Sequence, residues 1–403
     1  MRVALSTVAT INPRRPQIDL NDTDIVTFLP MEAVDDVTGT ITTRTQRTFA
    51  QVKKGYTVFA ENDVLFAKIT PCMQNGKHAI ASDLLHGIGF GSTEFHVIRH
   101  GPNLIPEWAH YFMRCQETLD AAVKTFTGTV GQQRVPPSFL ESLEIPVPSI
   151  DEQRRITDCI KVQLAAVEIA REAARAQLNE VRRLKTQALH EVFSNVKATS
   201  AIGEVARVQS GYAFKSLTFQ KHGVRLLRNA NISPGRVYWN DAVFLVPTEA
   251  ASFGAYELRE GDVLISLDRP IISSGIKVAR VSTVDLPALL VQRVGRFQID
   301  ETRLSPDYLY AYLQTHAFIE AITGHEQSLG VPHISPGQIE KIEIPLPDIH
   351  EQKHLAKLLI DIATYTSAAF VAAERQLRDI ELLPSRLLAQ AFDKLNHQVP
   401  DHG

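Results

Sequence analysis

Two long segments of this chain carry apolar or small residues at steps of three and four. In the first segment these positions are Ile156, Ile160, Leu164, Val167, Ala170, Ala174, Leu178, Val181, Ala188 and Val192. In the second they are Leu355, Leu358, Ile362, Tyr365, Ala369, Ala373, Leu377, Ile380, Leu383 and Leu387. This period predicts two amphipathic helices, each with an apolar seam for another helix. About 40 helical residues span roughly 60 Å.

Each long segment opens on nearly the same sequence. IPVPSIDEQ begins at Ile145, and IPLPDIHEQ begins at Ile344. The prolines force the chain to be extended, because proline fixes φ and restricts the residue before it. Ser149 or Asp151 is then placed to cap the helix that follows, and Asp348 offers the same in the second copy. Both motifs predict a loop that turns into a long helix.

The repeat extends beyond these junctions at a constant spacing of 199 residues. This spacing relates Gln153 to Gln352 and the ENDVL around Asp63 to the EGDVL around Asp262. A period of about half the chain indicates two copies of one unit. We therefore predict a first globular domain at residues 1–144, a long helix at 145–197, a second globular domain at 198–343, and a long helix at 344–396.

The globular domains mix strand and helix patterns. DVLFAKI and HAIAS are strand-like and flank Asn75-Gly76, which predicts a hairpin. Pro106 and Pro306 each begin a helix pattern with aromatic residues at three- and four-residue steps, which we expect in the core.

The predicted fold class is α+β. Two similar domains are joined by two long antiparallel helices that form a coiled coil, with an approximate internal two-fold repeat. Asp63 and Asp262 each enter a strand, and we expect them to cap a turn. We expect Pro384 to kink or stop the second long helix.

Composition places the chain among ordinary globular proteins. With 403 residues and 44% hydrophobic residues it is long enough for at least two domains. It has no run of about 18 consecutive apolar residues, so we expect no membrane span. The N-terminal apolar run is too short for a signal peptide, and the three cysteines form no metal-binding or disulfide pattern. We expect a cytoplasmic protein.

A search for catalytic motifs is negative. The formal net charge is −3, so nucleic-acid binding would have to come from a local surface. The chain has no phosphate-binding GxxxxGK[ST] loop, no GxGxxG after a strand, no HExxH and no GxSxG. A nucleotide-binding enzyme is therefore not supported, and we expect neither a catalytic residue nor a metal site.

The repeated IPxPxxxEQ junctions followed by long helices resemble the specificity subunits of type I restriction–modification systems. LFAKITPCMQNGK, GFGSTEFHV and VQRVGRF are also similar to that family, as is the Leu-rich helix end LLPSRLLAQAF. The resemblance covers essentially the whole chain. It implies that each globular domain is a target recognition domain reading one half of a split site in double-stranded DNA. The paired helices would set the gap and dock two methyltransferase subunits, with restriction and translocase subunits in systems that include them.

The same resemblance implies that this chain binds no cofactor. S-adenosylmethionine, ATP and magnesium would be bound by the partner subunits, which would carry the adenine-N6 methyltransferase and endonuclease activities. The chain itself would be a non-catalytic specificity subunit.

Candidate DNA-binding residues are the loop residues whose side chains suit bases or phosphates. Arginine pairs with guanine, asparagine and glutamine pair with adenine, and lysine, arginine and serine hold phosphates. In the first domain the candidates are Lys68, Thr70, Gln74, Asn75, Lys77, Gln132, Gln133 and Arg134. In the second they are Arg228, Asn229, Asn231, Arg269, Ser273, Ser274, Lys277, His333 and Ser335.

The apolar helix positions are the candidate subunit interface. We assign to it Ile156, Ile160, Leu164, Val167, Leu178, Val181, Leu355, Leu358, Ile362, Leu377 and Ile380. Two other functions remain open from the residues. The near-neutral charge also fits a structural coiled-coil scaffold with two protein-binding heads. A self-sufficient DNA-modifying enzyme is disfavoured, because its motifs are missing.

Overall fold

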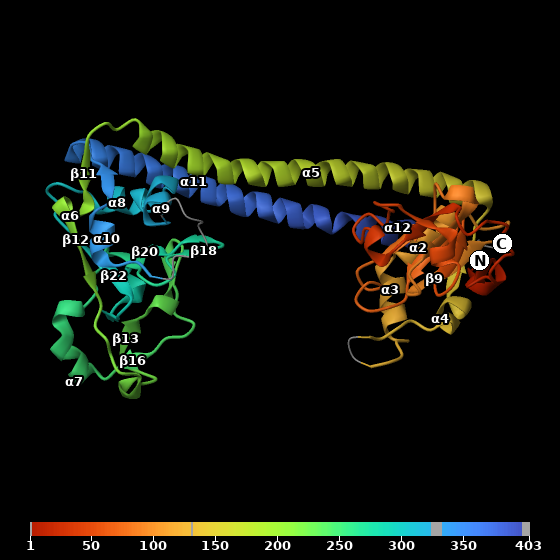
Figure 1. The fold of residues 1–403 in the computed structure, drawn as a ribbon, viewed down its shortest axis with the longest axis horizontal. Coiled ribbons are helices and arrows are strands. Elements are labelled where there is room, and N and C mark those ends of the chain that lie inside the picture. Colours follow the sequence, from red (N-terminus) through yellow and green to blue (C-terminus); the bar gives the residue numbers. More distant parts are fainter. Residues whose placement is uncertain (1, 130–131, 324–332, 397–403) are drawn as a thin grey trace, which may run out of the picture. The chain divides into compact units, whose positions relative to one another are not determined.

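The computed structural model describes residues 2–129, 132–323 and 333–396. The chain divides into two compact units. Unit 1 contains Met1–Arg175 and Arg375–Gly403, and unit 2 contains Ala176–Glu374. Helix α5 (Ile150–Ser194) begins in unit 1 and ends in unit 2. Helix α11 (Ile349–Glu381) begins in unit 2 and ends in unit 1. The core of unit 1 includes residues from the start of α5 and from the last helix, α12 (Leu383–Asn396), and the core of unit 2 includes residues from the end of α5 and the start of α11 (Figure 1).

The described part of unit 1 contains two four-stranded sheets and a short strand pair. Its strands are β1 (Arg2–Ala4), β2 (Ala9–Ile11), β3 (Ile25–Leu29), β4 (Thr45–Thr48), β5 (Thr57–Ala60), β6 (Val64–Ala67), β7 (His78–Ile80), β8 (Ile88–Gly91), β9 (Phe95–His100) and β10 (Glu144–Pro146). One sheet has the order β2-β9-β6-β7 and the other β4-β3-β8-β5, while β1 pairs with β10. Only β3 and β8 pair in parallel in these sheets. The mixture of sheets and helices agrees with the α+β prediction.

Short helices cover the first of these sheets. They are α2 (Pro106–Met113), α3 (Gln116–Val123) and α4 (Pro137–Ser142), while the single-turn α1 (Phe49–Val52) lies beside the second sheet. Helix α2 begins at Pro106, as predicted, and its aromatic residues are core contacts. Trp108 is fully buried and its indole nitrogen donates to the Pro146 carbonyl oxygen at 2.8 Å. That bond ties α2 to the strand that leads into α5.

Unit 2 repeats this arrangement, with three strands instead of four in its second sheet. They are β11 (Thr199–Ala201), β12 (Ala206–Ser210), β13 (Val224–Leu227), β14 (Ile232–Ser233), β15 (Arg236–Val237), β16 (Phe244–Leu245), β17 (Val263–Ser266), β18 (Ile271–Ile272), β19 (Gly275–Ile276), β20 (Val278–Arg280), β21 (Ala288–Leu290), β22 (Val294–Ile299) and β23 (Glu343–Pro345). The larger sheets have the orders β12-β22-β17-β20 and β16-β13-β21. In the second of these, β13 and β21 pair in parallel, as β3 and β8 do in unit 1.

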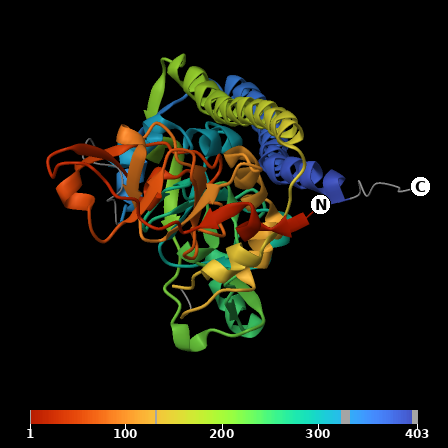
Figure 2. The ribbon, with the colours of Figure 1, turned by 90° about the vertical axis from the view of Figure 1, so that its right-hand side faces the viewer.

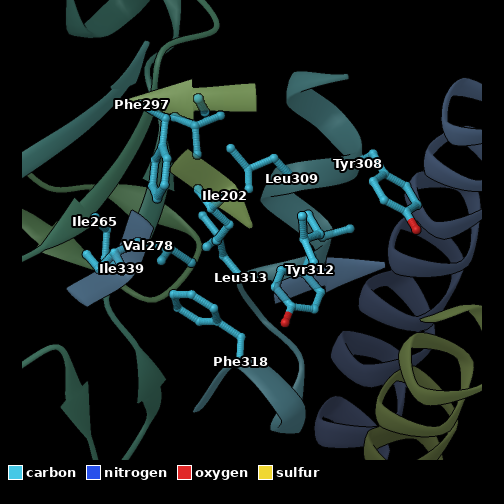
Figure 3. Close-up of a cluster of buried hydrophobic side chains, with 14 of the residues drawn as sticks. Ile202, Ile265, Val278, Phe297, Tyr308, Leu309, Tyr312, Leu313, Phe318 and Ile339 are labelled. Atoms are coloured by element: carbon cyan, nitrogen blue, oxygen red, sulfur yellow. The ribbon is translucent and has the colours of Figure 1, made fainter. Parts of the chain in front are cut away.

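The core of unit 2 joins its main sheet to the long helices. The short helices are α6 (Ile202–Val205), α7 (Pro247–Ala250), α8 (Pro306–Tyr312), α9 (His316–Thr323) and α10 (Pro336–Glu340). Figure 3 shows Tyr308 pointing from α8 toward the long helices, on the opposite side of α8 from Phe297. The Tyr308 ring centroid lies 4.9 Å from that of Phe193, near the end of α5.

The internal repeat keeps its strand register. Leu65 on β6 faces Val97 on β9, and Leu264 on β17 faces Arg296 on β22, so both partners are displaced by 199 residues.

The hairpin predicted around Asn75-Gly76 is confirmed, because β6 and β7 pair antiparallel across that connection. The Asp63 and Asp262 predictions are also confirmed. Their carboxylates accept hydrogen bonds from the amides of Ala60 and Arg259 at 2.7 and 2.8 Å.

The repeated glutamines explain the IPxPxxxEQ motif. Both Gln153 and Gln352 are fully buried. The Gln153 Oε1 accepts from the Ile105 amide at 3.0 Å, and its Nε2 donates to the carbonyls of Asn103 and Pro148 at 2.9 and 3.0 Å. Gln352 makes the equivalent bonds to Ser305, Arg303 and Pro347. Each side chain satisfies three backbone groups, and so fixes the start of a long helix against the loop before α2 or α8.

Replacing Gln153 with alanine is expected to destabilise unit 1 by about 3 kcal/mol. Buried backbone groups left without a partner cost about 1–3 kcal/mol each, and relaxation recovers part of that cost. Urea unfolding of the full chain measures the effect. Gln163→Ala is the matched control, because Gln163 lies on the same helix and is exposed. Equal unfolding midpoints for the two variants would contradict the structural role of Gln153.

The helix junctions settle which residues cap. Helix α5 begins at Ile150, and the Glu152 amide donates to the Ser149 hydroxyl oxygen at 3.3 Å, so Ser149 rather than Asp151 is the cap. Asp348 accepts from the amides of His350 and Glu351 at 2.9 and 3.0 Å. The interruption predicted at Pro384 is confirmed. Helix α11 ends at Glu381, and α12 (Leu383–Asn396) follows.

Within each unit the long helices pack antiparallel. In unit 1, Ile160 near the start of α5 shares a core with Leu388 and Phe392 of α12, and Figure 2 shows these yellow and dark blue helices side by side. In unit 2, Phe193 near the end of α5 shares a core with Ala356 and Leu359 near the start of α11. The predicted pairing of the two helices is therefore present inside both units.

Among the described residues, Ile349–Asp393 is long and apolar enough to cross a membrane on length and composition alone. The sequence analysis considered only uninterrupted apolar runs, and this helix is interrupted by polar residues, so it was not identified there. A single helix of this kind is weak support for a membrane span. Its buried residues, such as Leu359 and Leu388, pack in the cores of the two units.

Candidate nucleic-acid interface

Two loops of the first domain bring most of its candidate residues together. The loop between β6 and β7 lies beside the loop that precedes α4. The Thr70 amide donates to the Gln133 carbonyl and the Val135 amide donates to the Lys68 carbonyl, both at 2.9 Å. Backbone bonds between distant segments thus place Lys68, Thr70 and Gln133 side by side. The Thr70 hydroxyl is buried without a hydrogen-bond partner, so it does not face a ligand in this conformation.

Arg134 is held by a carboxylate of its own domain. Its Nε and Nη2 donate to the Glu94 Oε2 and Oε1 at 2.9 and 2.8 Å. The hydrogen bond with Arg134 holds the pKa of Glu94 below its usual value. This bidentate ion pair with Glu94 fixes the plane of the guanidinium group. To pair with guanine, Arg134 would have to exchange Glu94 for the base, so its assigned role as a base reader stays a prediction.

Lys77 and Lys277 occupy equivalent positions in the two domains. Each precedes the last strand of its main sheet, and the Lys77 and Lys277 carbonyls accept from the equivalent amides of Ala67 and Ser266. The Lys77 Nζ donates to the carbonyls of Met31 and Val34 at 3.4 and 2.9 Å. The Lys277 Nζ donates to the Asn229 Oδ1 at 2.7 Å, and its burial lowers its pKa. Both amines brace a 3-10 turn inside their own domain.

Several candidates of the second domain are buried or already paired within their own domain, so their assignment to DNA stays a prediction. Asn231 is 1% exposed and Lys277 is 8% exposed, so neither reaches a ligand in this conformation. Asn229 Oδ1 is used by Lys277 and by the Ser266 hydroxyl. Arg228 forms an ion pair with Asp241 at 2.9 Å. The sequence showed polar residues in a loop, but it did not show that they bond one another.

Ser335 also has a structural role. Its side chain and backbone exchange hydrogen bonds with Gln338, which caps helix α10. The sequence prediction gave Gln338 no role, so this capping box was missed. The capping bond accounts for the serine at this position without any ligand.

Several candidates remain exposed and uncommitted within the described ranges. In the first domain these are Gln74, Asn75 and Gln132, and in the second they are Arg269, Ser273, Ser274 and His333. Ser273 and Ser274 are the two residues that connect β18 to β19. His333 forms a β-bridge with Asp268, next to Arg269. The second domain thus repeats the close approach of two loops seen at Ile69 and Arg134 in the first.

The candidate interface positions on the long helices differ in burial. Ile160 and Val167 are buried, and the half-buried ones are Ile156, Leu164, Leu178, Val181, Leu355, Ile362, Leu377 and Ile380. Leu358 lies outside the buried seam between the two helices, and its assignment to a subunit interface stays a prediction. Leu358 is 43% exposed, whereas its neighbour Leu359 is 6% exposed. The seam near the start of α11 follows Gln352, Ala356 and Leu359 instead.

The described residues hold no group of three or more histidine, cysteine or acidic side chains that could bind a metal ion. The described side chains on the adjoining loops of the two domains include arginines, amides and hydroxyls. Such groups suit hydrogen bonding to bases and phosphates. Their arrangement at the same place in two copies of a domain indicates two separate binding surfaces of one kind.

Comparison with known proteins decides the family. The description "Type I restriction modification DNA specificity domain" matches residues 12–180 and again residues 195–368. The chain belongs to this family. It is 31% identical to the type I restriction enzyme EcoAI specificity subunit of Escherichia coli, over 88% of this chain and 76% of that protein. It is also 26% identical to the MjaVIII specificity subunit of Methanocaldococcus jannaschii, over 62% of each chain.

Solved structures show the same fold for this specificity subunit. A chain from a study of complex assembly and conformational transition of the type I R-M system superposes with a TM-score of 0.78, at 20% identity and over 97% of both chains. The HsdS subunit of Thermoanaerobacter tengcongensis superposes with a TM-score of 0.65, at 21% identity, over 97% of this chain and 96% of that one. Two tandem specificity domains and long helices are therefore the fold of this family.

Family membership establishes the broad role of the chain. It is a specificity subunit of a type I restriction–modification system, which supplies DNA sequence specificity to an assembly with other subunits. It is not itself the enzyme, because the catalytic activities of these systems reside in other subunits. The resemblance inferred from the junction motifs is confirmed.

Proposed function

We propose that the two domains read the two halves of a split site in double-stranded DNA. The observation that carries this proposal is the repeated pair of adjoining loops. The loop at residues 68–77 approaches residues 133–135 in the first domain, and the loop at residues 267–277 approaches residues 333–335 in the second. Each pair leaves amides, hydroxyls or an arginine exposed on a rigid sheet edge. A fixed scaffold that presents polar loops suits base recognition.

We further propose that the outer faces of the long helices dock two methyltransferase subunits, and restriction and translocase subunits where the system has them. Large apolar side chains are exposed there. In α5, Val162 and Ile169 are 71% and 69% exposed, and in α11, Tyr365 and Val371 are 76% and 61% exposed. Val162 and Ile169 are seven residues apart and so share one face. Exposed apolar rows of this kind favour packing by helices of a partner.

The partner subunits would bind S-adenosylmethionine, ATP and magnesium, and the assembly would work in the cytoplasm. This chain would contribute binding and spacing alone. The exposed helix faces also suit the second candidate, a coiled-coil scaffold with two protein-binding heads. That candidate predicts partner binding without any preference for a DNA sequence.

Sequencing native host DNA for N6-methyladenine, with and without this chain, tests the proposal. We expect one split motif to lose its methylation when the chain is removed, because no other subunit would select that site. Restoring the chain on a plasmid should restore the same motif. A methylome that is unchanged by removal, in cells that contain active methyltransferase subunits, would favour the scaffold.

A further inference from the structure

The connection between β12 and β13 differs sharply between the two copies of the repeat. Residues 205–240 contain six Lys or Arg residues and no Asp or Glu. The corresponding residues 6–41 of the first domain contain two arginines and six acidic residues. The basic stretch includes residues 211–223, which we name the basic loop. It holds Lys215 and Lys221, both exposed.

The basic loop is anchored at two points. Phe214 and Phe219 are half-buried and pack against the cluster that contains Leu226, Leu245 and Leu289. The ring centroid of Phe214 lies 4.8 Å from that of Phe253. These contacts fix the loop to the β16-β13-β21 sheet on both sides of its tip.

The tip between the anchors presents a leucine to solvent. Residues Ser216–Thr218 form a 3-10 turn, in which the Thr218 amide and hydroxyl donate to the Lys215 carbonyl at 3.0 and 2.8 Å. Leu217 at the centre of this turn is 94% exposed. A single exposed leucine is common on protein surfaces. Here, however, two aromatic anchors and a hydrogen-bonded turn hold it outward, so it does not fold back onto the domain.

An exposed aromatic residue stands at the base of the loop. Tyr212 is 41% exposed, and its ring centroid lies 4.7 Å from that of Phe253 and 4.9 Å from that of Phe214. Its amide donates to the Leu290 carbonyl and its carbonyl accepts from the Gln292 amide, at 3.1 and 2.9 Å. The ring is therefore rigidly placed while one side stays open.

The charges on the loop are free to meet an anion. In the described part of the chain, no hydrogen bond or ion pair involves the Lys215 or Lys221 amine. By contrast, Arg225 donates to the Val284 carbonyl and stacks on Trp239, and Arg228 is paired with Asp241. The two lysines that flank the tip are thus available to an anion.

We propose that the basic loop is a DNA-contacting element of the second domain alone. Lys215 and Lys221 neutralise phosphates on either side, and Leu217 is buried against the bases between them. Cations next to an apolar side chain are the combination used by proteins that press a side chain against base steps. This inference rests on the proposed function, and it adds a surface that lies outside the paired loops described above.

Charge favours DNA over a protein partner at this surface. The loop presents two unpaired cations and no acid, which suits a polyanion. The acidic counterpart in the first domain also argues against a symmetric partner. Two copies of one partner subunit would require similar surfaces on both domains.

The test compares variants of this chain assembled with its methyltransferase subunits. The probe is a labelled duplex that carries the split motif found by methylation sequencing, and fluorescence anisotropy is measured from 50 to 200 mM salt. For Lys215→Ala with Lys221→Ala, we expect weaker binding, and the slope of log K against log salt should shrink by about 1.8, since each phosphate contact contributes about 0.9. For Leu217→Ser we expect about tenfold weaker binding at an unchanged slope, because one buried leucine contributes about 1.5 kcal/mol or more.

Matched controls are available on the surface of the protein. Val284→Ser removes a side chain that is 78% exposed in the same domain. Lys54→Ala with Lys124→Ala removes two exposed lysines of the first domain. Neither control should change the affinity as the loop variants do. All replaced side chains are exposed, so thermal unfolding should stay the same throughout.

The outcomes separate this inference from the proposed function. If the wild-type assembly prefers the split motif and the loop variants bind it with wild-type affinity and slope, the basic loop does not contact DNA. If the variants instead lose methyltransferase subunits in mass photometry, the loop is a protein contact and the inference is overturned. If the wild-type assembly prefers no split motif, the proposed function fails and this inference fails with it.

Discussion

Shortening both long helices by four residues is expected to change the gap of the recognised site while leaving its two half-sequences intact. The chain crosses between the two units only within α5 and α11. Removing residues 176–179 from α5 and 372–375 from α11 takes away one turn plus about 40° of rotation and about 6 Å of length. That length corresponds to about two base pairs of duplex, since one turn of about 34 Å holds 10–10.5 base pairs.

Methylation at the original spacing should fall by about 100-fold or more, because even small misplacement of a reacting group has effects of that size. Methylome sequencing of cells that express the shortened chain reports the new gap directly. Replacing Gln177, Asn179, Glu374 and Arg375 with alanine keeps the helix length and serves as the control. Retention of the original gap by the shortened chain would show that the helices do not set the spacing.

Acidification is expected to unfold the first domain before the second. His78, His96 and His110 are buried in the first domain, and burial lowers the pKa of each, that of His110 to about 3. The equivalent positions of the second domain are Val278, Gly295 and Leu309. Among the described residues of that domain, no histidine is buried.

The sign follows from proton binding. In the unfolded chain these histidines take up protons near pH 6.5, whereas the folded domain excludes protons until the pH approaches the lowered values. Stability is therefore complete above about pH 6.5 and falls as the pH drops below it. A buried histidine costs up to about 1.4 kcal/mol per pH unit between its unfolded and folded pKa, so His110, with a folded pKa of about 3, alone accounts for roughly 2 kcal/mol lost at pH 5.

Hydrogen exchange of the full chain at pH 7 and pH 5, corrected for intrinsic exchange rates, measures the effect separately in each domain. His110→Leu copies the second domain at that position and should reduce the acid sensitivity of the first domain. The structure gives a reason to expect tolerance, because the His110 Nδ1 is buried without a hydrogen-bond partner. Equal loss of protection in both domains, or no change in the His110→Leu variant, would contradict the role of these histidines.

The sequence by itself determined the repeat and its junctions. Prolines, capping residues and apolar periods act over a few residues, so the starts of α2, α5, α8 and α11 followed from local pattern alone. The 199-residue spacing then implied that Gln153 and Gln352 share a role. Family resemblance through these motifs was enough to identify the specificity subunit, because the motifs describe the scaffold that its members share.

Tertiary structure alone decided which polar residues are available. Arg134 meets Glu94 and Lys277 meets Asn229 across 40 and 48 residues of sequence, and no local pattern predicts such pairs. A loop residue looks the same in sequence whether its side chain braces the domain or faces solvent. The same limit explains why the sequence placed Leu358 rather than Leu359 in the seam between the helices. A shift of one position along a helix turns a side chain by about 100° out of the seam.

The exposed basic loop is the clearest example of this division. Its charge was visible in the sequence, but its acid-free composition gave no sign that Phe214 and Phe219 would anchor it or that Leu217 would point outward. Exposure depends on which distant residues cover a segment, and those are brought together only when the whole domain packs. Local chemistry thus fixed the framework of the protein, and long-range packing selected the side chains that its surfaces present.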